Sequence, residues 1–220
     1  NGIASLKNYP VITHSFASEI ADAVDSRLES VYKCELSGYT RTLLSMKNGP
    51  FFLFDQVKSQ KQHSYNWIFH AEHTNGKSSI AYSGKRFTVT RPAARLTVDV
   101  LLPETIDGKI RDSDRAESFI ALSSGKLNDA VFLAVMRPEG KTPDGGFSSM
   151  PGAGLIESGG WTGAKVQQDG TDYFAFFRPA ADQASGIEGF TTDASRFMAA
   201  IEGGKLSKTY FEGSNFEGYG

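Results

Sequence analysis

The sequence of 220 residues has little that would cross-link it, charge it strongly or hold it in a membrane. Cys34 is its single cysteine, which excludes an internal disulfide and a cysteine metal cage and leaves the compartment open. The formal net charge of -2 gives no electrostatic footprint for nucleic acid. Neither a membrane-spanning apolar run nor a signal peptide is present in the given sequence. We therefore expect a soluble chain with no nucleic-acid or membrane partner, although export could have removed a leader before Asn1.

Common catalytic and nucleotide-binding motifs are also missing. The chain has no phosphate-binding loop, no dinucleotide glycine fingerprint, no HExxH and no GxSxG elbow. Asp112 and Asp114 fall in a polar loop expected over Glu104–Arg115, and two side chains are too few to hold calcium. A solvated turn is the simpler interpretation of these two carboxylates.

The composition indicates a turn-rich β protein, with 12% aromatic residues, 16 Phe and 23 Gly. Apolar runs, alternating or continuous and bounded by turn residues, predict strands over Thr40–Lys47, Phe51–Val57, His63–His73, Ser78–Tyr82, Arg86–Thr90, Arg95–Leu101, Ser118–Leu122, Ala130–Met136, Ala164–Gln168, Tyr173–Phe177, Ile187–Thr192, Arg196–Ile201 and Lys205–Phe211. Packed antiparallel sheets or a barrel cover so many apolar strand faces. We predict one all-β domain over residues 1–220, a two-layer antiparallel β-sandwich of roughly a dozen strands with at most one or two short helical turns.

Three segments fit this scheme less simply. Residues 1–15 are expected to form a lead-in, with a short strand possible over Val11–Phe16. Phe16–Tyr32 carries apolar residues at a helical spacing of four and also alternates over Ala21–Asp25. We expect a strand there, followed by a helical turn that Asp25 could start. Residues 138–154 are rich in Pro, Gly and Ser and predict a long loop within the domain.

Asp55 is the most unusual residue of the predicted central hairpin. Asn48-Gly49 joins the strands Thr40–Lys47 and Phe51–Val57, and an Asn-Gly pair between such runs is a strong hairpin signal. Counting back across the turn brings Asp55 close to Arg41. Because buried charges are normally paired, we predict a structural ion pair between them, with an active-site role for Asp55 as the alternative.

The strand His63–His73 brings together three of the four histidines. A period of two places His63, Tyr65, Trp67 and His73 on one face and His70 on the other. This parity leaves at most two histidines on each face, too few to hold zinc by themselves, so no metal site is predicted here. The substrate-binding candidates of this strand are His63, Tyr65, Trp67, His70 and His73. A sugar-stacking surface could also be formed by Tyr65, Trp67, Tyr82 and Trp161, although aromatic residues in strands more often belong to the core.

The order of features from Tyr39 to His73 resembles the C-terminal β-sandwich of the heparinase II/III-like polysaccharide lyases, a group that includes alginate and oligoalginate lyases. The matching features are an Arg-Thr-Leu strand at Arg41, a Phe-Leu-Phe-Asp-Gln-Val strand containing Asp55, and a His-x-Tyr-x-Trp strand that closes on His70. The resemblance continues through YSGKRFTVTRPAARLTVDVLLPE and, more weakly, TTDASRFMAAIEGGKL. It covers most of the chain from about Ala21 onward.

The resemblance implies β-elimination on uronate-containing glycans by a carbon–oxygen lyase. In such lyases the catalytic tyrosine and its Asn or His partner lie in an α/α toroid that precedes the sandwich. The catalytic histidine and zinc ligands of the sandwich lie before the region matched here, and His14 does not align with them. No catalytic residue is therefore carried over, and no cofactor is expected in this chain, although the parent lyase could hold zinc.

The sequence thus predicts the C-terminal β-sandwich portion of a heparinase II/III-like lyase, periplasmic or secreted. It would serve as scaffold and as one wall of the cleft for an acidic polysaccharide, with the catalytic toroid supplied in cis or in trans. A stand-alone carbohydrate-binding module is the alternative function. An autonomous metal-dependent enzyme, built on the histidine strand, is a third hypothesis.

Overall fold

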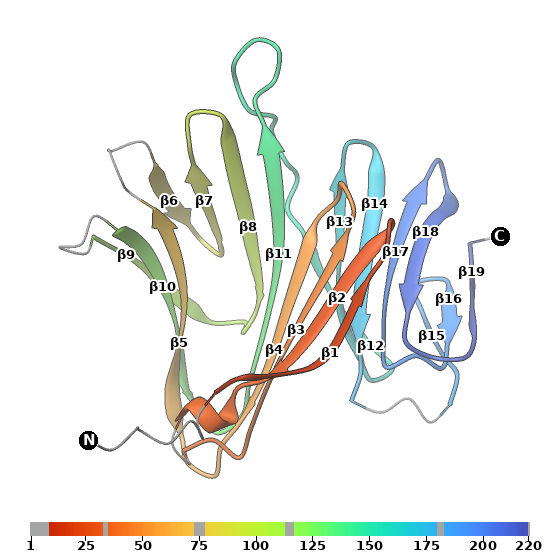
Figure 1. The fold of residues 1–220 in the computed structure, drawn as a ribbon, viewed down its shortest axis with the longest axis horizontal. Helices are drawn as coiled ribbons and strands as arrows, with labels where there is room; N and C mark the ends of the chain where they lie inside the picture. Colours follow the sequence, from red (N-terminus) through yellow and green to blue (C-terminus); the bar gives the residue numbers. More distant parts are fainter. Residues whose placement is uncertain (1–8, 33–34, 73–77, 113–116, 180–182, 220) are drawn as a thin grey trace, which may run out of the picture.

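The computed structural model describes residues 9–32, 35–72, 78–112, 117–179 and 183–219, which form four antiparallel sheets (Figure 1). The largest sheet has eight strands, in the order β1 (Val11–Ala17), β2 (Ala21–Arg27), β3 (Gly38–Met46), β4 (Phe51–Lys58), β11 (Ala130–Gly140), β8 (Ala94–Leu102), β7 (Arg86–Thr90) and β6 (Ser79–Ser83). A second sheet has five strands, in the order β12 (Gly154–Ser158), β13 (Trp161–Gln168), β14 (Thr171–Phe177), β17 (Arg196–Glu202) and β18 (Lys205–Phe211).

Two three-stranded sheets complete the molecule. One has the order β5 (His63–Glu72), β10 (Glu117–Leu127) and β9 (Ile106–Asp112), and the other has β15 (Ser185–Ile187), β16 (Phe190–Thr192) and β19 (Phe216–Gly218). A single 3-10 turn, η1 (Glu29–Tyr32), is the only helical element among the described residues. No described helix has the length and apolar character needed to cross a bilayer.

The sheets follow one another as layers from left to right in Figure 1. The eight- and five-stranded sheets pack face to face through Phe52, Phe54, Val166 and Phe177, and this pair confirms the predicted antiparallel sandwich. The sheet β5-β10-β9 covers the outer face of the eight-stranded sheet, where Trp67 packs. The sheet β15-β16-β19 covers the outer face of the five-stranded sheet. Each large sheet therefore packs an apolar core against both of its faces.

β4 shows how the sequence encodes this layering. Phe52 and Phe54 enter the core between the two large sheets, whereas Leu53 and Val57 enter the core under β5. The continuous apolar run predicted a strand covered on both faces, and the structure confirms it. The hairpin before it has the predicted turn, with Asn48 in the left-handed region at φ 62°.

The structure differs from the predicted elements at several places. Nineteen strands occur in the described residues, more than the dozen expected, because short pairs such as β15 and β16 divide runs that read as one strand. The predicted polar loop Glu104–Arg115 contains β9, whose alternation Ile106, Gly108, Ile110 is weak. Asp25 does not start a helical turn, since β2 continues to Arg27 before η1.

The predicted lead-in and long loop also have different boundaries. Within the expected lead-in 1–15, β1 begins at Val11 and pairs with β2. The expected loop 138–154 begins only after Gly140, because β11 continues through Pro138, which lies opposite Leu96. Pairing of β11 with β4 ends at Met136, so beyond it β11 is open on that side and tolerates a residue without an amide hydrogen.

Candidate functional site

Residues 63–68 of β5 line a half-open cavity of about 460 Å³, which we call the β5 pocket. The face parity predicted from the sequence is correct, since Trp67 and Ala71 are buried while Ser64, Asn66, Ile68 and His70 are exposed. Half of the residues that line the pocket carry rings, namely Tyr32, Tyr39, His63, Tyr65, Trp67 and Phe132. Three of the five predicted substrate-binding residues, His63, Tyr65 and Trp67, therefore lie together here.

A closed polar cluster lies beside this pocket, centred on Asp55. The register of the hairpin places Arg41 directly opposite Asp55, and the predicted ion pair is present, with Arg41 Nη2 2.6 Å and Nε 2.8 Å from the carboxylate oxygens. Tyr39 Oη donates to the same carboxylate at 2.9 Å, and Trp67 Nε1 donates at 2.8 Å. Asp55 has no exposed surface. Four donors thus satisfy a buried carboxylate, which has about four lone-pair sites.

The surroundings of Tyr39 and Arg41 favour the protonated form of both side chains. Burial, together with the charge of Asp55, raises the pKa of the Tyr39 phenol, so the phenol remains a donor. Burial alone would lower the pKa of Arg41, but the hydrogen bond and the charge of Asp55 outweigh it and raise that pKa. An occupied carboxylate and a protonated phenol are poorly suited to accept a proton from a substrate. The cluster is therefore arranged to brace β3, β4 and β5.

His63 lies at the edge of the β5 pocket. Its Nδ1 is 3.8 Å from Glu35 Oε2, and its Nε2 is buried with no hydrogen-bond partner among the described residues. Tyr65 beside it donates through Oη to the Asn128 carbonyl at 2.8 Å. Both residues are half-buried and line the pocket, as do the exposed residues Ser64 and Asn66.

The structure does not bring the remaining candidates to this pocket. His70 is exposed on the opposite face of β5, with its ring 5.6 Å from that of Phe119. His73 lies outside the described residues. No group of three or more His, Cys, Asp and Glu side chains within the described part of the chain could hold a metal ion.

The two tryptophans of the alternative sugar-stacking surface are buried. Trp67 is 4% exposed and its indole nitrogen is used by Asp55, while Trp161 is 1% exposed in the core under β15-β16-β19. Tyr82 packs its ring over Gly108 of β9, where an added Cβ would lie 2.4 Å from the ring. Stacking on tryptophan, the main expectation for a stand-alone carbohydrate-binding module, is therefore unavailable at these positions.

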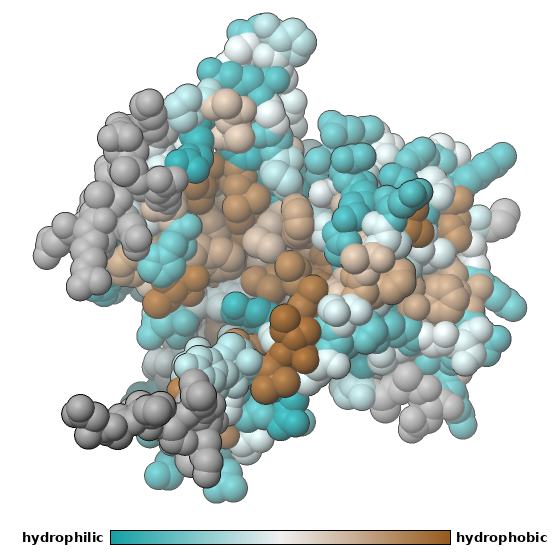
Figure 2. All heavy atoms as spheres, in the orientation of Figure 1, coloured by the Kyte–Doolittle hydropathy of each residue, from teal (hydrophilic) through white to brown (hydrophobic). Residues whose placement is uncertain are grey.

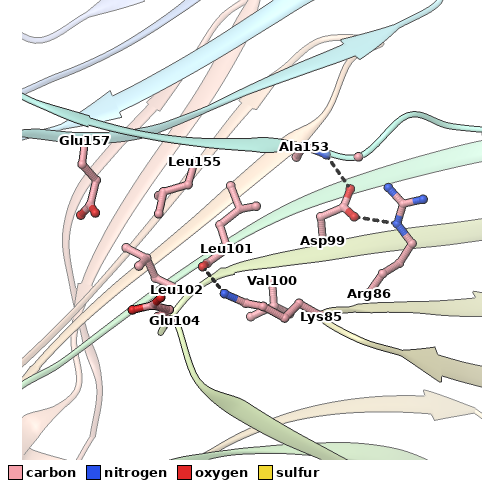
Figure 3. A pocket seen from close by; sticks show the side chains of 11 residues that line it. Lys85, Arg86, Asp99, Val100, Leu101, Leu102, Glu104, Ala153, Leu155 and Glu157 are labelled. Atoms are coloured by element: carbon pink, nitrogen blue, oxygen red, sulfur yellow. Dashed lines mark hydrogen bonds and ion pairs between the residues drawn. The ribbon is translucent and has the colours of Figure 1, made fainter.

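A second and larger cavity, of about 760 Å³, was not predicted (Figure 3). It lies between the end of β8 and β12, where Glu157 and Leu155 face Leu102 and Glu104 across the open space. Lys85 Nζ donates to the Leu101 carbonyl at 2.6 Å, and burial lowers the pKa of this lysine. Part of this cavity could have been found in the sequence, because polar residues alternate with apolar ones in RFTVTR and RLTVDV, which gives these strands one polar face. The strand β12 has no such pattern.

No protein-family model and no curated protein matches this chain. Solved structures do match it. Heparinase III matches with a TM-score of 0.55 and 14% identity, covering 77% of this chain and 27% of that structure. The heparan sulfate lyase HepC from Pedobacter heparinus matches with a TM-score of 0.54 and 12% identity, covering 71% and 26%. The heparinase III BT4657 gene product matches with a TM-score of 0.54 and 14% identity, covering 92% and 28%.

The chain spans only about a quarter of the length of these structures. At such low identity the likeness concerns the arrangement of the strands and does not extend to particular side chains. The sequence resemblance pointed to the same group of proteins, and this comparison supports it at the level of the fold. The chain therefore has a heparinase-like β-sandwich fold.

Proposed function

We propose that this chain is the C-terminal β-sandwich portion of a heparinase II/III-like polysaccharide lyase that acts on uronate-containing glycans. The observation that supports the proposal most is the heparinase-like fold, matched over 71–92% of this chain but over only about a quarter of each neighbour. The neighbours are named as heparinases or heparan sulfate lyases. A piece of such a protein is a better description of this chain than a complete enzyme.

The proposed reaction is β-elimination. A base removes the proton beside the uronate carboxylate, that carboxylate is neutralised by the enzyme, and the 4-linked sugar leaves as a double bond forms. Asp55 and Tyr39 are poor candidates for the base because their hydrogen bonds hold them as acceptor and donor within the fold. We therefore assign the base to an α/α toroid, in cis or in trans, and assign to this chain the bracing of one wall of the cleft.

Within this proposal, β5 contacts the glycan through His63 and Tyr65. Both line the β5 pocket, His63 with a buried Nε2 that has no hydrogen-bond partner among the described residues and Tyr65 with a hydroxyl that donates to the Asn128 carbonyl. Trp67, next to them on the same face of β5, donates to Asp55 and so fixes this strand against the eight-stranded sheet. His70 is assigned no contact because it lies on the other face of the strand.

Mixing the chain with a separately produced α/α toroid of a heparinase-like lyase tests this proposal. The readout is the ultraviolet absorbance of the unsaturated uronate product, with alginate and heparan sulfate as substrates and a neutral glucan as control. We expect the mixture to form product faster than either part alone. If the toroid alone is as fast as the mixture, or if the chain alone is active, the proposal is wrong.

A further inference from the structure

The face of the eight-stranded sheet that is covered by residues 141–153 carries an unusual group of charges. Directly opposite residues on paired antiparallel strands point to the same face, so the registers of β7, β8 and β11 define a patch. We call this the arginine patch, and we define it by Arg86, Thr88, Thr90, Arg95, Thr97, Asp99, Arg137 and Glu139.

The arginine patch has three guanidinium groups and two carboxylates. Arg95 Nε is paired with Glu139 Oε1 at 2.5 Å. Arg86 Nε and Arg137 Nη2 share Asp99, at 2.6 Å and 2.5 Å. One positive charge is therefore left without its own carboxylate within the patch.

The uncompensated charge lies at a buried position. Arg137 has no exposed surface, and its Nε and Nη1 atoms have no hydrogen-bond partner in the described part of the chain. Burial lowers the pKa of this guanidinium, but arginine remains charged at neutral pH. A buried charge with free donors is costly unless an opposite charge or another polar group approaches it.

A cavity of about 350 Å³ lies over this patch, between the side chains of Arg86 and Arg95. Thr88 and Thr97 form part of its lining, and Thr97 lies directly opposite Arg137 in the sheet. Ser148 and Ser149 of the covering segment line it from above. The lining thus combines two guanidinium groups and four hydroxyl-bearing residues with the apolar residues Phe147 and Met150.

The arginines also hold the covering segment in place. Arg86 donates through Nη1 to the Met150 carbonyl and through Nη2 to the Pro151 carbonyl, both at 3.1 Å. Arg95 donates to the Ser148 carbonyl, and its guanidinium lies 5.0 Å from the Phe147 ring centre. These bonds fix the two guanidinium groups at the sides of the cavity instead of leaving them to move in solvent.

We propose that this cavity binds an oxyanion, a sulfate or carboxylate group, held by Arg86 and Arg95 and by the hydroxyls of Thr88 and Thr97. Planar guanidinium groups match such anions with paired, charge-assisted hydrogen bonds. The anion supplies a negative charge beside the patch, which has one more guanidinium than carboxylate. It could be a free inorganic ion or a substituent of an acidic glycan, and only the glycan source rests on the proposed function.

Titration calorimetry of the whole chain with sodium sulfate, at constant ionic strength balanced by chloride, tests the site. We expect saturable binding that weakens at least tenfold in Arg95→Gln. The matched control is Arg27→Gln, which removes an exposed arginine paired with Glu29 and should bind sulfate as the native chain does. If Arg95→Gln does not fold, Thr88→Val removes one lining hydroxyl and should weaken binding as well.

A second titration distinguishes the sources of the anion, with a sulfated heparin disaccharide and its desulfated form as probes. Binding of the sulfated disaccharide, without binding of the desulfated form, supports the glycan source. Binding of inorganic sulfate, without binding of either disaccharide, supports a free anion. Absence of saturable sulfate and sulfated-sugar binding, or equal weakening in Arg27→Gln, overturns the site. Such a result would not change the expected outcome of the toroid experiment, so the anion site and the proposed function are tested independently.

Discussion

Asp55 joins three strands through one buried carboxylate. Arg41 of β3, Tyr39 of β3 and Trp67 of β5 all donate to it, so the outer sheet is tied to the eight-stranded sheet by directed bonds as well as by apolar packing. Such a carboxylate is stabilising only while all its partners are present, because each donor was removed from water to reach it.

Replacement of Asp55 by asparagine should therefore lower the free energy of unfolding by about 3–5 kcal/mol, since it leaves Arg41 as a largely uncompensated charge. Urea unfolding followed by tryptophan fluorescence measures this change. Asp107→Asn makes the same chemical change at an exposed position and should alter stability by less than about 0.5 kcal/mol. Equal effects of the two substitutions would contradict the structural role of Asp55.

Glu212 gives the fold a dependence on pH. Burial by itself raises the pKa of this carboxyl, but hydrogen bonds from Arg196 and Tyr210 outweigh burial and hold the pKa below its ordinary value of 4.5. Because the folded pKa is lower than the unfolded one, the contribution to stability is complete above about pH 4.5 and is lost as the pH falls through the folded value. Asp25, which also binds Arg196, and His14, 3.1 Å from Glu212, complete the charged surroundings.

The expected result is that Glu212→Gln is less stable than the native chain at neutral pH and that this difference shrinks below about pH 4.5. Thermal unfolding between pH 3 and pH 7 measures it. Glu217→Gln, at an exposed position, should show no such trend. A difference that grows on acidification would show that Glu212 is not stabilised in its charged form.

His63 and His70 provide a matched pair for the proposed glycan contact. In the mixture of chain and toroid, His63→Ala should raise KM about three- to tenfold, equivalent to one lost hydrogen bond of about 0.5–1.5 kcal/mol. His70→Ala should change KM by less than about twofold, because His70 lies on the opposite face of β5. A larger effect on KM at His70 than at His63 would place the glycan on the opposite face of β5 and contradict the proposed contact.

Among the strands, β13 and β14 pack so closely that Gly163 has no space for a side chain. An added Cβ on Gly163 in β13 would lie 2.3 Å from the Ala175 carbonyl oxygen and 2.3 Å from the Phe176 ring. Backbone of a paired central strand cannot move easily, so β13 requires glycine at this position.

Gly163→Ala should therefore destabilise the chain by about 1–3 kcal/mol through overpacking. Gly125→Ala in β10 is the control, since an added Cβ there meets nothing within 4 Å and its stability should be unchanged or higher by up to about 1 kcal/mol. Chemical unfolding of both variants measures the contrast. If Gly163→Ala is as stable as Gly125→Ala, the close pairing of β13 and β14 is wrong.

The hairpin of β3 and β4 was predictable because its register is set within about twenty residues, by an Asn-Gly turn and by apolar runs on either side. The same local count gave the Arg41–Asp55 pair. β9, β12 and β19 were missed because their strand character depends on neighbours distant in sequence rather than on their own alternation. For the same reason the Trp67 donor to Asp55, and the arginine patch, became visible only when strands distant in sequence were placed side by side.

At the scale of the whole molecule, the two large sheets are enclosed by smaller sheets on their outer faces (Figure 1). Brown apolar atoms gather on the visible surface near the centre of the molecule, between teal regions (Figure 2). The exposed apolar side chains include Val11, Ile12 and Phe16 of β1, which is an edge strand of the eight-stranded sheet. Polar bonds such as Trp67 to Asp55 and Arg196 to Asp25 instead join one sheet to the next.

The central claim is that this chain supports a glycan cleft and does not break glycosidic bonds by itself. The most direct measurement is a long ultraviolet time course of the isolated chain with alginate and with heparan sulfate, first after dialysis against a chelator and then with added zinc. The account predicts no unsaturated uronate in any of these reactions. Steady formation of that product by the isolated chain, with or without zinc, would contradict it.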